Sequence, residues 1–64
     1  MQLNNTELAQ LADHLVYNID CNPDFEDDAF AITFRGVRCY IERYRDNFRV
    51  EVGHEDDVVQ LPRI

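Results

Sequence analysis

The chain contains no serine, no lysine and no tryptophan, and it has only two glycines, two prolines and two cysteines. Without serine, the nucleophile of a serine hydrolase is missing. Two isolated glycines, Gly36 and Gly53, cannot form a glycine-rich phosphate loop. Two cysteines are too few for a disulfide framework, so we expect Cys21 and Cys39 to be reduced. A disulfide between them is the minority alternative.

Long apolar runs are also missing from the sequence. No stretch of 18 residues is apolar throughout, so we expect no transmembrane helix and no membrane partner. Residues 1–11 lack the basic and apolar regions of a signal peptide, and cytoplasmic residence is therefore the default expectation. The 64 residues predict a single domain, 1–64, and the hydrophobic fraction of 45% is enough for one core. A chain of this length buries only about 60% of its unfolded surface, which leaves little volume for an enclosed substrate pocket. We therefore expect a binding module that uses no cofactor, and not an enzyme.

Charge is strongly unbalanced and is arranged in blocks. Thirteen acids oppose six arginines, for a net charge of −7. Residues 1–28 carry seven acids and no base, residues 29–50 carry an excess of arginine, and residues 51–64 are acidic again. Such a field repels nucleic acid and anionic membranes and attracts basic protein surfaces.

The N-terminal region is predicted to form an amphipathic helix. Asn4 and Glu7 have the spacing of a capping box, and Leu3 lies where a hydrophobic staple would begin. The helix should end near 18–20, because Pro23 disfavours helical backbone in the residue before it. One apolar stripe recurs at spacings of three and four, formed by Leu8, Leu11, Ala12, Leu15, Val16 and Ile19.

After an acidic loop over 20–28, the apolar period changes from 3.6 to 2, which predicts strands over 29–34, 37–44 and 48–52. Phe25 is the one loop residue expected to pack inward. Gly36-Val37 suits a two-residue type II′ turn, and 45–47 form the next turn. The inward-facing residues are Phe30, Ile32, Phe34, Val37, Cys39, Ile41, Phe48, Val50 and Val52.

The strand register can be predicted from charge. Pairing Ile41 with Val50 sets Glu42 opposite Arg49, whereas a slip of two residues would set Glu42 opposite Glu51. The tail, 54–64, could form a short fourth strand, limited by Pro62 to an edge, or a helical turn; its valines favour the extended form. The predicted fold is α+β: an N-terminal helix packed on a three- or possibly four-stranded antiparallel sheet, in the order α-β-β-β.

Two metal sites can be considered, and neither fits. The alternating oxygen ligands of 20–26 superficially match an EF-hand, but Phe25 replaces the required glycine and Ala31 replaces the bidentate glutamate. A zinc site would lack any knuckle spacing among its ligands. It would have to use Cys21, Cys39, His14 and His54. We therefore expect no metal.

The outward face of the predicted sheet could bind a partner. Arg38, Tyr40, Tyr44 and Arg49 could stack on single-stranded nucleic acid. The net charge and the two glutamates of the same face oppose this. A solvated face with cross-strand ion pairs, or a protein interface, therefore fits better, and we expect no direct contact with nucleic acid.

The acidic clusters are the strongest functional candidate. Carboxylates at alternate extended positions stand roughly 6–7 Å apart, a spacing similar in scale to successive phosphates. They could form one negative ridge that occupies a basic groove, and the tail acids would extend it if the tail folds back beside the loop. The predicted partner-binding residues are Asp20, Asp24, Glu26, Asp27, Asp28, Glu55, Asp56, Asp57, Tyr17 and Tyr40. The tyrosines are included as interface anchors.

In size, acidity and element order, the whole chain resembles the small acidic inhibitors encoded by bacteriophages, which include anti-CRISPR proteins and DNA mimics. These proteins share no motif, so the resemblance assigns no residue. It implies an inhibitor that docks on a CRISPR complex or another nucleic-acid-handling complex. The alternatives are an antitoxin-like or adaptor module that binds through its sheet face or edge, and a homodimer formed through an edge strand.

Overall fold

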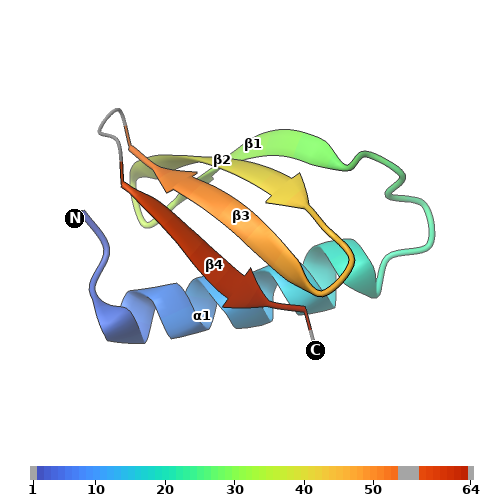
Figure 1. The fold of residues 1–64 in the computed structure, drawn as a ribbon, viewed down its shortest axis with the longest axis horizontal. Coiled ribbons are helices and arrows are strands. Elements are labelled where there is room, and N and C mark those ends of the chain that lie inside the picture. The colour runs from blue at the N-terminus through green and yellow to red at the C-terminus, as the bar shows by residue number, and fades with distance from the viewer. Residues whose placement is uncertain (1, 54–56, 64) are drawn as a thin grey trace.

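A computed structural model describes residues 2–53 and 57–63, in which one helical layer covers one face of a four-stranded sheet (Figure 1). The predicted α+β class is confirmed. All strand pairs are antiparallel, and neighbours follow the chain in the order β1-β2-β3-β4, so β1 and β4 are the two edges. No helix in the described ranges is long and apolar enough to cross a membrane. The elements are α1 (Asn5–Leu15), η1 (Val16–Asp20), β1 (Ala29–Phe34), β2 (Val37–Arg43), β3 (Asn47–Val52) and β4 (Val58–Pro62).

The helix begins as its sequence predicts. The Asn4 side chain accepts a hydrogen bond from the Glu7 backbone N–H at 2.8 Å, and Glu7 Oε1 accepts one from the Asn4 N–H at 3.1 Å. This capping box satisfies two of the amides that the first turn leaves without a helical partner. The last turn, η1, is a π-helical turn that the sequence did not predict. There the Cys21 N–H donates to Val16 O at 2.9 Å, and the widened turn ends at Asp20.

The central strand register is confirmed. Ile41 pairs with Val50, and Glu42 pairs with Arg49, as charge and burial predicted. Alternate residues of β2 and β3 point to the helix, and the inward residues of β3 are fully buried. The core is formed by Leu3, Leu11, Ala12, Leu15, Ile19, Cys39, Ile41, Phe48, Val50, Val52 and Leu61.

The first hairpin turn differs from its prediction by one residue. Phe34 pairs with Val37, so the turn residues are Arg35 and Gly36, not Gly36 and Val37. Both have positive φ, 53° and 77°, which is the pattern of a type I′ turn and matches the twist of the flanking strands. The predicted turn would have set Arg35 directly opposite Arg38, whereas the observed register sets Thr33 there and avoids that repulsion.

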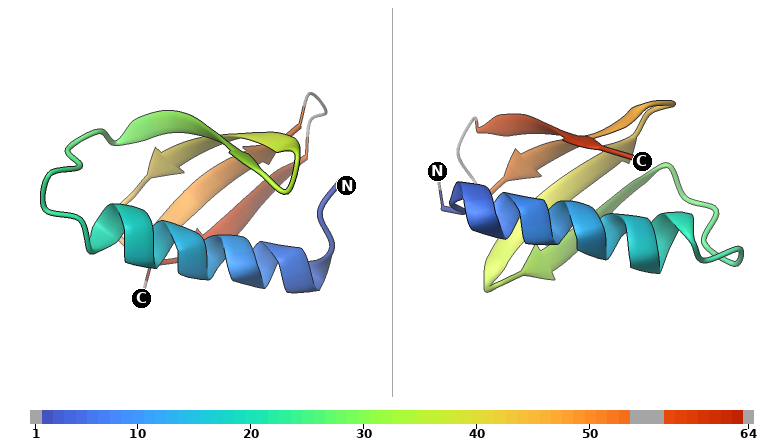
Figure 2. Two further views of the ribbon diagram at one scale, coloured as in Figure 1. Left: turned by 180° about the vertical axis from the view of Figure 1, so that it is seen from behind. Right: turned by 90° about the horizontal axis from the view of Figure 1, so that it is seen from below.

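The second hairpin turn is one residue shorter than the predicted 45–47, and the tail, which the sequence left open, is extended. The Tyr44 N–H donates to Asn47 O at 2.9 Å, so this turn has two residues and Asn47 already belongs to β3. The tail forms β4, an edge strand in which Pro62 lies opposite Asn47. The helix backbone approaches the sheet most closely at β4 (Figure 2), and Leu61 of that strand completes the core.

Burial should decide the effect of a valine truncation. Val50 is 0% exposed, whereas Val58 in the neighbouring strand is 42% exposed. We expect Val50→Ala to lower the free energy of unfolding by about 2–3 kcal/mol, because it removes two methyl groups from a packed core and leaves a cavity. Val58→Ala should cost less than about 1 kcal/mol. Urea unfolding followed by circular dichroism measures both variants, and equal losses would contradict the assigned core.

Candidate functional site

The acidic loop, defined as residues 21–28, begins with a turn encoded by Asn22-Pro23. The Phe25 N–H donates to Asn22 O at 3.1 Å, and the Asp24 N–H donates to the Asn22 side chain at 3.0 Å. Asparagine at the first turn position and proline at the second are favoured for this geometry, since one caps the turn and the other presets φ. The chain therefore leaves the helix in a defined direction.

Phe25 holds the middle of the loop against the sheet, as the sequence predicted. Its ring makes an edge-to-face contact with Phe30 of β1, with centroids 4.9 Å apart. The Arg43 guanidinium lies 5.4 Å from the centroid of the same ring, within cation–π range. A side chain of the loop is thus packed against the apolar core while its acidic neighbours remain outside.

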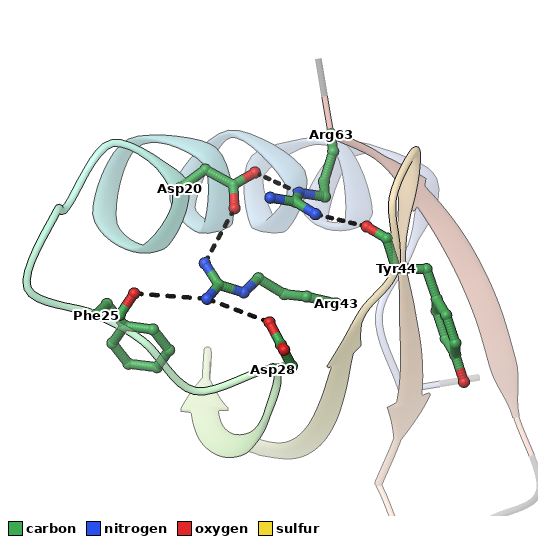
Figure 3. A network of polar contacts seen from close by, with 6 residues as sticks. All are labelled: Asp20, Phe25, Asp28, Arg43, Tyr44 and Arg63. Carbon is green, nitrogen blue, oxygen red and sulfur yellow. Dashed lines mark hydrogen bonds and ion pairs between the residues drawn. The ribbon is translucent and has the colours of Figure 1, made fainter.

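The base of the loop is closed by an ion-pair network centred on Asp20 (Figure 3). Arg43 Nη1, at the end of β2, lies 3.3 Å from Asp20 Oδ1, and Arg63 Nε, after β4, lies 2.9 Å from Asp20 Oδ2. Arg43 also reaches Phe25 O and, at 3.5 Å, Asp28 Oδ1, while Arg63 donates to Tyr44 O. We call Asp20, Arg43 and Arg63 the Asp20 network. It joins the helix end, the acidic loop, β2 and the C-terminal segment.

The network compensates an acid in an unfavourable place. A carboxylate at the C-terminal end of a helix faces the negative end of the helix dipole. The Asp20 side chain is also only 16% exposed and that of Arg43 only 10%, so each charge has lost most of its water. Such groups are stable together because each is the other's partner. Removing one leaves the other as a poorly hydrated charge without compensation.

Asp20 therefore differs from the other predicted partner-binding acids. Both of its oxygens are engaged by arginines inside the domain, so it positions the acidic loop and does not belong to its exposed surface. Asp24, Glu26, Asp27 and Asp28 are all exposed, and Asp28 keeps 83% of its side-chain surface free although it lies near Arg43. These four residues are called the loop acids below.

The second acidic cluster does not extend the first. Asp57 immediately precedes β4, and its carbonyl accepts a hydrogen bond from the Val52 N–H. The start of β4 lies at the opposite end of the sheet from the acidic loop (Figure 1). The condition on which the tail acids would extend the ridge, that the tail folds back beside the loop, is therefore not met at Asp57. The reason is topological, because β4 returns antiparallel to β3 and brings its far end, not its start, to the loop. Glu55 and Asp56 lie outside the described residues.

The outward sheet face is uncovered and largely neutralised. Arg49 Nη1 lies 2.8 Å from Glu42 Oε1 and 3.0 Å from Glu51 Oε1. Hydrogen bonding to Glu51, and then to Glu42, raises the pKa of Arg49 above its ordinary value. Tyr40 and Tyr44 are exposed on this side of the domain, and Tyr17 is exposed on the helix. The predicted cross-strand pairing is confirmed, so Arg49 is already paired within its own sheet.

The two cysteines have different environments. Cys39 is buried in the core, and burial raises the pKa of its thiol. Cys21 is exposed after the last helical turn, and neither thiol forms a disulfide. Within the described ranges there is no group of three metal-ligating side chains and no pocket. Asp20 and Asn22, the first two residues of the EF-hand-like pattern, are bonded to arginines and to the backbone respectively.

Two network residues were missed from sequence, and one of them had a detectable signal. By strand alternation Arg43 falls on the inward side of β2, and an inward arginine requires an acidic partner. Extending the observed β1–β2 register by one pair also sets Arg43 beside Asp28. Arg63 gave no such signal, because its pairing with Asp20 depends on how β4 crosses the helix.

Comparison of the chain with protein-family models, with curated proteins and with solved structures found no match.

Loss of the Asp20 carboxylate should destabilise the fold, whereas loss of a loop acid should not. Asp20→Asn removes the charge opposite two arginines, one of which has a side chain only 10% exposed, and we expect the free energy of unfolding to fall by about 1–3 kcal/mol. Asp24→Asn changes the net charge equally at an exposed site and should change stability by less than about 0.5 kcal/mol. Urea unfolding at neutral pH measures both variants. An unchanged free energy of unfolding in Asp20→Asn would show that the network contributes little to stability.

Thiol labelling should distinguish the two cysteines. In the folded protein, we expect an aromatic disulfide reagent to modify Cys21 rapidly, because its thiol is exposed. Cys39 should react only when the domain opens, since its sulfur is buried and its raised pKa disfavours the thiolate. Single Cys21→Ala and Cys39→Ala variants assign the two phases. Rapid labelling of Cys39 at low denaturant concentration would contradict its place in the core.

Proposed function

We propose that this protein is a non-enzymatic, cytoplasmic inhibitor that binds another protein through the loop acids. These carboxylates would occupy a basic groove that its target, a nucleic-acid-handling complex of the CRISPR type or similar, uses to hold a phosphate backbone. One observation carries the proposal: the loop acids are exposed on a loop whose base and middle are held by the Asp20 network and by Phe25.

A braced loop is the arrangement that such binding requires. A flexible acidic segment would lose conformational entropy when it docked, whereas a loop held in place before binding avoids much of that cost. Among the described residues, the two arginines at the base of the loop contact Asp20, and Asp28 is the one loop acid that also lies within ion-pair distance of either arginine. The net charge of −7 then adds long-range attraction to a basic groove and speeds association.

The charge that a partner would meet at this end of the molecule remains negative. Residues 20–28 contain five acids, and the two arginines of the Asp20 network compensate two of them. Tyr17 is exposed one helical turn before Asp20 and could anchor the contact with an aromatic ring. The supporting observations are thus the exposure of the loop acids, their surplus charge and a neighbouring tyrosine.

A second candidate function is an adaptor or antitoxin-like module that binds through the outward sheet face. The observation in its favour is that the helix covers only the opposite face, so Tyr40 stays exposed in the middle of the sheet. The Glu42–Arg49–Glu51 pairs would form the polar surroundings of such an interface. This candidate requires no contact with the loop acids.

Charge reversal in the acidic loop should weaken partner binding selectively. Tagged wild-type protein would be used to capture a partner from bacterial lysate, with parallel washes at low and high salt. We expect capture to fall as salt rises, and Asp27→Lys to weaken binding to the recovered partner by about tenfold or more. Asp27 is the residue of choice because Asp28 contacts Arg43 and its reversal would disturb the network.

Asp13→Lys is the matched control, since it makes the same charge change at an exposed position on α1. Equal weakening by the two variants would mean that only net charge matters and would contradict a docked loop. Retention of the partner at high salt, with loss of binding in Tyr40→Ala and not in Asp27→Lys, would favour the sheet-face module instead.

A further inference from the structure

Strand β1 is an edge whose outer backbone groups are free to pair. The Arg43 N–H donates to Asp28 O at 2.7 Å, which fixes the phase of hydrogen bonding between β1 and β2. By the alternation of antiparallel ladders, residues 30, 32 and 34 then bond to β2, and the amide and carbonyl groups of Ala29, Ala31 and Thr33 point away from the sheet. Among the described residues, no hydrogen bond to these outward groups is formed.

This edge lacks the features that usually prevent strand pairing. Natural edge strands carry charges, proline or bulges, or they are covered by another element. β1 has the sequence Ala-Phe-Ala-Ile-Thr-Phe, with no charge, glycine or proline over six residues, and its partners in β2 are consecutive, without a bulge. The other edge, β4, ends in Pro62 and lies closest to the helix.

The inward side of β1 is also incompletely covered. Phe30, Ile32 and Phe34 are only half-buried, whereas the inward residues of β3 are fully buried. The helix passes closest to β4, at the far side of the sheet. The row on β1 is covered at its two ends by single side chains, Phe25 of the acidic loop at Phe30 and His14 of α1 at Phe34. An additional strand beside β1 would cover this row as well as the free backbone groups.

We propose that β1 pairs with β1 of a second copy of this chain, antiparallel about a twofold axis through Ala31, to form a continuous eight-stranded sheet. In this register Ala31 lies opposite Ala31 of the second copy, and Ala29 lies opposite Thr33. Ala29, Ala31 and Thr33, whose backbone groups point to the free edge, then all lie in hydrogen-bonded pairs. Each such pair exchanges two N–H···O bonds. The outward side chains at the junction are small, so they do not obstruct the approach.

Charge complementarity supports a second copy as the occupant. Two molecules with a net charge of −7 repel, but 29–34 is uncharged, and the acids that precede it in one copy lie at the opposite end of the junction from those of the other. At each end of the junction, Arg35, which follows β1 in one copy, lies on the same side as the acids that precede β1 in the other copy. A twofold axis at Ala31 thus combines the free backbone groups, the apolar row and a pair of opposite charges.

The test is a charge-swap experiment at the axis, because a residue on a twofold axis meets its own copy. Size-exclusion chromatography with light scattering should give wild type a mass of twice 7.6 kDa across a dilution series. Ala31→Lys alone and Ala31→Glu alone should each halve that mass, since identical charges then lie face to face. An equimolar mixture of the two variants should recover the dimer.

Val58→Lys and Val58→Glu are the matched controls, since they place the same charges at an exposed position of the other edge strand, and they should remain dimeric. Circular dichroism verifies that every variant is folded. A monomeric wild type, dimeric single variants at Ala31 or no recovery in the mixture would each overturn the proposal. The purified protein is used alone, and residues 22–28 are unchanged, so the outcome is independent of partner capture by the loop acids.

Discussion

The pairing of the Asp20 carboxylate with two arginines is the interaction on which the arrangement of this domain most depends. The carboxylate lies at the end of the helix and binds one arginine from β2 and another from the segment after β4. Three parts of the chain that are distant in sequence therefore meet at one poorly hydrated group. A domain of this size has a small core and a small margin of stability, so an ion network at its periphery can decide how the loop beside it is held.

The same network explains how a chain with six arginines presents an acidic surface. Arg43 and Arg63 are paired with Asp20, and Arg49 is paired with two glutamates of its own sheet. Arginine suits this role because its planar group can contact several oxygens at once, as Arg43 does with Asp20, Asp28 and Phe25 O. Three of the six arginines are thus engaged in ion pairs within the domain, and the loop acids remain exposed at its surface.

The acidic loop and the free edge strand are consecutive in the chain, since the loop ends at Asp28 and β1 begins at Ala29. Pairing of two β1 strands would therefore place two acidic loops at opposite ends of one junction. A dimer of this kind would present two identical docking surfaces on a rigid sheet, and bivalent binding would increase affinity without any new contact. The two proposals are tested separately, yet they describe a single arrangement of the molecule.

The helix with its capping box, the strand periods and the Glu42–Arg49 register could all be predicted from sequence. These features depend on residues within a few positions of one another or directly opposite on paired strands, where geometry is nearly invariant. The turn at Arg35-Gly36, the separation of Asp57 from the acidic loop and the pairing of Asp20 with Arg63 were decided by the tertiary structure. The turn is set by the register of β1 against β2. The other two features depend on where whole elements cross, which is set by the summed packing of the core and by the return of β4 along β3. The sequence alone thus determined which acids are available. Only the fold decided that Asp20 is paired with arginines inside the domain and that the loop acids remain exposed.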